Sequence, residues 1–148
     1  MLNLLKNILN SQNSQEDNSN KDLELLCGLM IEAAYTDGQI DEIELNKIRL
    51  SLINVFGEKP EDVALVLNEA EQNKNNSKSL HHYTSYINKN FNDDKKLLLI
   101  QALWEIVLSD GQIHDYESNL IRRLAGLLYI SDVNSGNARK RALDKNKN

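Results

Sequence analysis

The sequence predicts an all-α protein built from a duplicated helical unit. Apolar residues recur at helical spacing along most of the chain, and no segment shows the alternating β-branched pattern of a strand. In addition, the motif Asp-Gly-Gln-Ile-x-x-x-Glu occurs at residues 37–44 and again at residues 110–117. Flanking residues repeat at the same offset, which indicates two copies of one structural unit.

The first copy accounts for three predicted helices. Asp22 is a candidate N-cap for a helix over Asp22–Asp37, and Gly38 is a plausible C-terminal stop because glycine takes left-handed backbone angles without strain. The next helix is predicted over Asp41–Phe56, with Gly57 ending it. The third begins at Pro60, which together with the following acids suits a first helical turn, and runs to Glu71.

The second half repeats this plan after a polar loop at residues 72–78. A short helix is predicted over Ser79–Asn88, followed by a helix over Asp93–Ser109 that is apolar on nearly every side and therefore central to the fold. Two more helices are expected over Asp115–Leu128 and Asp132–Leu143. The prediction is a multihelical fold with two central helices, Asp22–Asp37 and Asp93–Ser109.

Two short segments precede the domain. Residues 1–10 place Leu2, Leu5, Ile8 and Leu9 on one helical stripe, which predicts a short amphipathic helix. This helix is expected either to dock on the domain or on a second copy, or to fray. The alternative is a helix that lies on a membrane surface, where contact with anionic lipid would be weak because Lys6 is its only basic residue. Residues 11–21 are polar and read as a flexible linker. The helical domain is predicted over residues 22–148, with a basic C-terminal helix and tail.

Composition limits the functional classes. The chain has 148 residues and a net charge of −5, which argues against a nucleic-acid-binding protein because such proteins need a basic surface. No segment is long and apolar enough to span a membrane. The single cysteine, Cys27, lies among leucines and reads as a small core residue, in keeping with a reducing compartment. We expect a cytoplasmic protein.

The repeated motif has a purely structural explanation. Asp41 and Glu44 have the spacing of a capping box, in which each side chain accepts a hydrogen bond from the start of the helix. In the second copy His114 replaces Asp41, so the box is poorer, although Glu117 still lies in the first turn where the helix dipole favours an acid.

A divalent metal site is the competing explanation. The motif looks like the second half of an EF-hand loop, but Ala33 and Tyr35 occupy the first two ligand positions in one copy and Ile106 and Leu108 in the other, so an EF-hand is rejected. A site shared between the copies remains, in which calcium, manganese or magnesium relieves repulsion between clustered carboxylates. Its four ligands would be Asp37, Glu44, Asp110 and Glu117.

Two further acids call for partners. Glu105 interrupts an otherwise apolar helix, and Glu32 is its equivalent in the first copy. A buried charge requires a counter-charge, and Arg49 and Arg122 recur at matching positions on the helices that fold back. We predict one ion pair in each copy, Glu32 with Arg49 and Glu105 with Arg122, with plain surface placement as the alternative.

The paired motifs, preceded by Thr36 and Ser109, resemble those of the TerB-like domain of bacterial tellurite-resistance and stress proteins. So does the C-terminal part of the chain, residues 128–132 with 138–142. The resemblance covers about Asp22 to Leu143. It implies two central helices and two three-helix repeats related by pseudo-twofold symmetry, an acidic surface proposed to bind divalent metal, and a role in stress-response assemblies at the inner face of the membrane. His114 departs from the usual residue there.

Two functional hypotheses follow. In the first the protein is a non-enzymatic helical adaptor whose acidic duplicated turns bind a protein partner. In the second it is a metal-responsive sensor or buffer that uses the four acids. No Ser-His-Asp arrangement, nucleophile elbow, phosphate-binding glycine loop or paired-cysteine metal spacing occurs, so no enzyme is expected.

Overall fold

The computed structural model describes residues 21–35, 40–72, 79–109 and 114–146, and the structural statements below concern these residues. Within them the chain forms only helices and no strand, which confirms the all-α prediction. The first helix covers residues 21–34. It is followed by α2 (Glu42–Asn54), α3 (Pro60–Gln72), α4 (Leu80–Asn90), α5 (Asp93–Val107), α6 (Asp115–Leu127) and α7 (Asp132–Asn146).

Helix boundaries fall close to those expected from the sequence, with two differences. The first helix already includes residue 21, so Asp22 lies inside it and is not its N-cap. The last helix continues to Asn146, beyond the predicted end at Leu143. The proposed stop at Gly38, the amphipathic segment at residues 1–10 and residues 11–20 of the predicted linker lie outside the described residues, whereas residue 21, predicted as the last of the linker, is helical. No described helix is long and apolar enough to cross a lipid bilayer.

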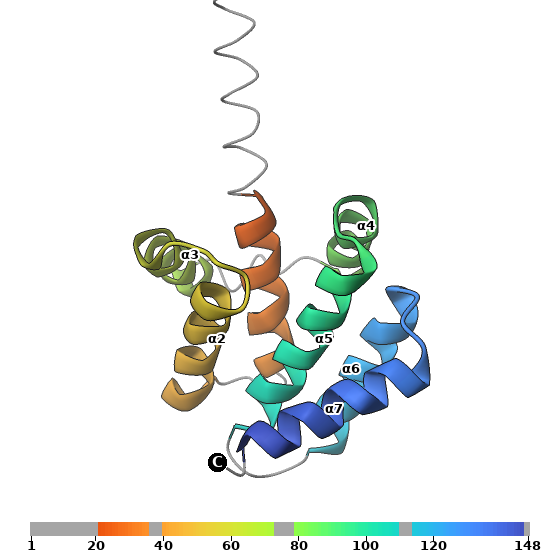
Figure 1. The fold of residues 1–148 in the computed structure, drawn as a ribbon. Coiled ribbons are helices and arrows are strands. Elements are labelled where there is room, and N and C mark those ends of the chain that lie inside the picture. Colours follow the sequence, from red (N-terminus) through yellow and green to blue (C-terminus); the bar gives the residue numbers. More distant parts are fainter. Residues whose placement is uncertain (1–20, 36–39, 73–78, 110–113, 147–148) are drawn as a thin grey trace, which may run out of the picture.

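The two helices predicted to be central do form the core. Most residues of α5 are buried, among them Leu99, Ile100, Leu103, Trp104 and Ile106. In the helix of residues 21–34, the buried side chains include Leu26, Leu29, Met30 and Ala33. Both helices run through the middle of the molecule in Figure 1, with α2 and α3 on one side and α4, α6 and α7 on the other. A helix that is apolar all round needs such cover on every side.

The duplication is visible in the helix boundaries. The offset between the two motifs also relates the first and last residues of α2 to those of α6, and it relates α3 to α7 within a residue. Two three-helix units result, residues 21–72 and Asp93–Asn146, with α4 between them; the residues that correspond to α4 at the repeat offset lie outside the described residues. The pseudo-twofold relation between the units stays a prediction.

The two units are packed differently. In α7 the side chains buried at α5 are small, Ser135, Ala138 and Ala142, so the two helices approach closely along their length. The corresponding positions of α3 hold Asp62, Leu65 and Glu69, and the Leu65 side chain is 63% exposed. Of these two helices, α7 therefore carries a seam of buried small residues and α3 does not.

A polar contact ties the first helix to the second half of the chain. Tyr86 on α4 donates its hydroxyl hydrogen to the carboxylate of Asp22, and Lys95 Nζ on α5 lies 3.4 Å from the same carboxylate. Burial, together with the hydrogen bond to Asp22, raises the pKa of Tyr86 to about 12, so the phenol remains a donor at all physiological pH values. Asp22 thus joins three helices.

The end of α6 holds the chain in an uncommon conformation. Tyr129 has a φ of 61° although it is not glycine, and the amide of Ile130 donates to the carbonyl of Ala125 at 2.8 Å, as in a Schellman turn. The buried Lys96 donates from Nζ to the carbonyl of Leu128 at 3.3 Å, and Asn88 donates to that of Leu127 at 3.1 Å. The negative end of α6 thereby receives a cation from α5.

A glycine in the first helix provides a test of this packing. A Cβ added at Gly28 would lie 2.9 Å from Tyr83 Oη and 3.0 Å from Cε1 of the same ring. We predict that Gly28→Ala lowers the free energy of unfolding by about 1–3 kcal/mol because the ring must shift. Gly136→Ala is the control. Nothing lies within 4 Å of a Cβ added at this position, so alanine should raise the free energy of unfolding by about 0.5–1 kcal/mol. Urea denaturation measures both, and a stabilised Gly28→Ala would contradict the packing.

Candidate functional site

The helix ends that flank the two duplicated turns lie at the same end of the molecule. In Figure 1 the C-terminal ends of the helix of residues 21–34 and of α5 lie toward the bottom of the view, as do the N-terminal ends of α2 and α6. Asp37 and Asp110 lie outside the described residues, whereas Glu44 and Glu117 lie in the first turns of α2 and α6. The described part of the candidate site is therefore formed by these two helix starts.

The start of α2 has the predicted cap. Asp41 is in an extended conformation, and its Oδ1 accepts a hydrogen bond of 2.8 Å from the backbone amide of Glu44. Ile40, just before the cap, is half-buried and packs against the hydrophobic core. This half of the capping box is confirmed, and it accounts for Asp41 without a ligand.

The start of α6 differs, as the sequence predicted. His114 occupies the cap position, and its side chain makes no capping hydrogen bond. Asp115 and Glu117 lie in the first turn, where their negative charges interact favourably with the positive end of the helix dipole. Glu117 is only 8% exposed, whereas Glu44 is half-buried, so the two copies of the motif place their last carboxylate in different environments.

The shared metal site remains a prediction. Among the described side chains no group of three or more histidines, cysteines or acids is placed to hold a metal ion. Two of the four proposed ligands, Asp37 and Asp110, are outside that search.

The structure exposes a pair of apolar residues whose exposure was not predicted from the sequence. Ile43 in the first turn of α2 is 58% exposed, and Tyr116 in the first turn of α6 is 68% exposed. The two positions are related by the offset of the motifs, and exposed acids stand next to both of them. The signal in the sequence was the repetition of a large apolar or aromatic residue two positions after the capping residue, where the helical period did not require it for the core.

The predicted ion pair of Glu105 is wrong in its partner. Glu105 is buried on α5, and its Oε1 lies 3.1 Å from Nζ of Lys145 on α7, at ion-pair distance but without the alignment of a hydrogen bond. Arg122 on α6 is exposed. The reason is the close packing of α7 on α5, which brings the last turn of α7 against Glu105.

The first-copy pair is not formed either. Within the described residues Glu32 makes no ion pair with Arg49, whose guanidinium instead donates a hydrogen bond to Oδ1 of Asn46 on the same helix. Glu32 is half-buried and Arg49 is exposed. The alternative of plain surface placement describes Arg49.

Basic residues of α7 attach this helix to α5. Arg141 Nε donates to Oε1 of Gln101 at 2.8 Å, and the guanidinium of Arg139 lies 5.6 Å from the ring centre of Trp104. With Lys145 on Glu105, three cations of α7 face α5. The basic C-terminal helix of the sequence is thus explained by packing within the chain.

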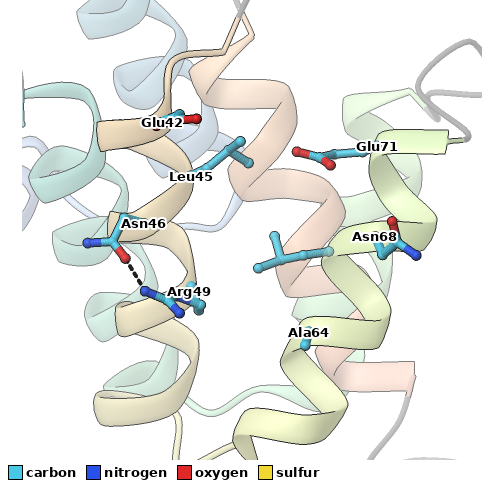
Figure 2. A pocket seen from close by; sticks show the side chains of 8 residues that line it. Glu42, Leu45, Asn46, Arg49, Ala64, Asn68 and Glu71 are labelled. Atoms are coloured by element: carbon cyan, nitrogen blue, oxygen red, sulfur yellow. Dashed lines mark hydrogen bonds between the residues drawn. The ribbon is translucent and has the colours of Figure 1, made fainter.

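A groove between α2 and α3 was also not foreseen. It has a volume of about 330 Å³ and lies beside the first helix (Figure 2). Its lining consists of Glu42, Leu45, Asn46, Arg49, Ala64, Leu67, Asn68 and Glu71. Sequence periodicity could not show it, because a groove depends on how far apart two helices lie.

The Glu105–Lys145 contact generates a stability prediction. Lys145→Met should leave a buried carboxylate without its counter-charge and lower the free energy of unfolding by about 1–3 kcal/mol. Lys140→Met, an exposed position on the same helix, should change it by less than about 0.5 kcal/mol. Adding Glu105→Gln to Lys145→Met should restore part of the loss in thermal unfolding. Equal effects of the two lysine variants would show that the contact is unimportant.

Comparison with known proteins agrees with this architecture. The family model described as tellurite resistance protein TerB matches residues 24–140, which reach from the first described helix into α7. The search of curated proteins gave no match. The search of solved structures also gave none. Because the family model covers most of the chain, including both helical units and the helix between them, the chain belongs to the TerB family.

Proposed function

We propose that this TerB-family protein is a non-enzymatic helical adaptor that binds a protein partner through the surface around its duplicated turns. The setting would be a tellurite-resistance or stress response in the cytoplasm. We call this surface the paired-turn surface and define its described part as Asp41, Glu42, Ile43, His114, Asp115 and Tyr116, all of which are exposed. The observation that carries the proposal is the matched exposure of Ile43 and Tyr116.

Large apolar side chains surrounded by charged groups have the composition of a small binding surface. Protein interfaces have apolar or aromatic anchors at their centre and a polar rim, and tyrosine is common among the anchors. Isolated exposed apolar residues are ordinary on protein surfaces, so a single one would carry no argument. Here both copies expose one at the same position of the repeat, next to the same type of turn.

Charge suggests the nature of the partner. Asp41, Glu42 and Asp115 are exposed beside the two anchors, and the chain as a whole has a net charge of −5. Such a surface would attract a basic protein surface and would repel an acidic one, and this steering weakens as salt screens it. The partner we propose therefore presents basic residues around apolar pockets.

The test compares anchor variants with matched surface variants. We expect Ile43→Ser with Tyr116→Ser to weaken capture of the partner at least about tenfold, because each anchor of this kind contributes on the order of 1–2 kcal/mol. The control, Leu65→Ser with Val133→Ser, removes two equally exposed apolar side chains elsewhere. Quantitative mass spectrometry after crosslinked purification from the native cell measures capture, and circular dichroism checks folding. Equal losses of partner capture in the anchor variant and the control variant would contradict the adaptor proposal.

The second candidate is a sensor or buffer that binds calcium, manganese or magnesium through Asp37, Glu44, Asp110 and Glu117. It is favoured by Glu117, a carboxylate kept buried in the first turn of α6 directly after the second motif. Carboxylate oxygens are the ligands that these cations prefer.

Metal binding has a distinct signature in stability. If the four acids bind a cation only when folded, metal at a hundred times its Kd should raise the free energy of unfolding by about 2.7 kcal/mol. Asp110→Asn should abolish most of that gain, while Asp93→Asn, an exposed acid at the start of α5, should leave it intact. Amide NMR titration with each metal would locate the site. Unchanged spectra at millimolar metal would rule out this candidate and leave the adaptor proposal standing.

A further inference from the structure

The groove between α2 and α3 has an apolar floor and a charged rim. Leu45, Ala64 and Leu67 provide aliphatic surface, and Figure 2 shows the Leu45 side chain directed into the space between the two helices. Glu42 and Glu71 lie toward one end of the groove, and Arg49 lies farther along it. A volume of about 330 Å³ accepts several aliphatic side chains but not a whole helix, so a helical occupant would insert only its apolar face.

The groove is a particular feature of the first unit. The positions of α6 and α7 that correspond to Leu45, Ala64 and Leu67 hold Ser118, Asn137 and Lys140, none of which is apolar. The second unit also closes α7 onto α5 with its small-residue seam. An apolar floor that is absent from the other copy is not required by the repeated fold, which indicates a local role.

The chain contains a segment whose chemistry matches this groove. Residues 1–10, which lie outside the described residues, place Leu2, Leu5, Ile8 and Leu9 on one helical stripe. Lys6 is the only charged residue of the segment, and two of the three charged residues that line the groove are acids, Glu42 and Glu71. The apolar stripe of the segment thus matches the apolar floor of the groove, and the positive charge of Lys6 matches the two acids at its rim.

The connection between segment and groove is long enough. The ten residues from Ser11 to Asn20 can span up to about 33–36 Å, whereas α2 and α3, with 13 residues each, are each about 20 Å long. Both helices stand beside the helix that the linker enters (Figure 1). Docking within one chain also benefits from the high effective concentration that a short linker provides.

We propose that residues 1–10 form an amphipathic helix that docks its apolar stripe into the α2–α3 groove of the same chain, with Lys6 toward Glu42 and Glu71. The groove shares Glu42 with the paired-turn surface, but the two anchors of that surface, Ile43 and Tyr116, do not line the groove, so docking and partner binding can be tested separately. It assigns an intramolecular ligand to the groove and makes the N-terminal segment part of the domain.

Paramagnetic NMR on the full chain tests the docking. A spin label is attached through Asn7→Cys, a position about 200° around a helix from both Leu5 and Leu9, so the label points away from the apolar stripe. Cys27 should not compete, because burial raises the pKa of its thiol to about 12 and the reactive thiolate is scarce. The expected result is strong broadening of the amide signals of Asn46, Ala64 and Asn68, with little effect on α6 and α7.

Matched variants identify the binding surface. Ala64→Arg fills the groove from an exposed position without removing a core side chain, and Leu5→Asp places a charge on the docking stripe; both should abolish the broadening. Leu65→Arg, the adjacent exposed residue of α3 outside the groove lining, should preserve it. Heteronuclear spectra of each variant verify that the domain remains folded.

Three outcomes would overturn the proposal. One is the absence of broadening around the groove in the labelled chain. Another is broadening that persists in Ala64→Arg, which would place the segment on a different surface. The third is broadening that appears when spin-labelled, isotopically unlabelled chain is mixed with isotopically labelled chain, which would make a second copy the occupant.

Discussion

Burial of α5 on every side is the constraint on which the rest of the structure depends. Leu99, Ile100, Leu103, Trp104 and Ile106 are each at most 1% exposed, and each large apolar side chain moved out of water contributes roughly 1.5–3 kcal/mol. No single neighbour can cover a helix all round, so α2, α6 and α7 all contact it. The same arrangement supplies partners to two buried polar residues on α5. Lys96 is matched by the carbonyl end of α6, and Glu105 is matched by Lys145 at the end of α7.

Duplication of the sequence did not produce two equal packings. Both units have helices of matching length and position, yet α7 presents Ser135, Ala138 and Ala142 to α5 while α3 carries larger or charged residues at the same places. Small residues allow two helix backbones to approach closely, and larger ones keep them apart. The second unit is consequently held by Arg139, Arg141 and Lys145 on α5, and the first unit has an apolar groove beside α2.

The helix starts after the two motifs combine a structural role with an exposed surface. Asp41 caps α2, and the acids of α6 lie at the favourable end of its dipole, so the motif serves the fold even without a ligand. The same starts expose Ile43 and Tyr116, which do nothing for the core. That division allows capping chemistry and the proposed binding surface to occur in one short motif.

The sequence by itself determined the elements of this protein. Helical periodicity, capping residues and the repeated motif act within a few residues of one another, so they predicted the all-α class, the duplication, the central position of α5 and helix limits correct to within about three residues. The cap at Asp41 and its weaker equivalent at His114 were predicted for the same reason.

Tertiary structure decided which distant side chains meet. Glu105 was correctly expected to need a cation, but the repeat pointed to Arg122, and the seam of α7 brought Lys145 instead. Asp22 looked like a cap, whereas it joins Tyr86 and Lys95 because α4 and α5 pack beside the first helix. The groove at Leu45 and Leu67 was invisible for the same reason. Each of these depends on the distance between helices, which side-chain volumes at long range set and local pattern does not encode.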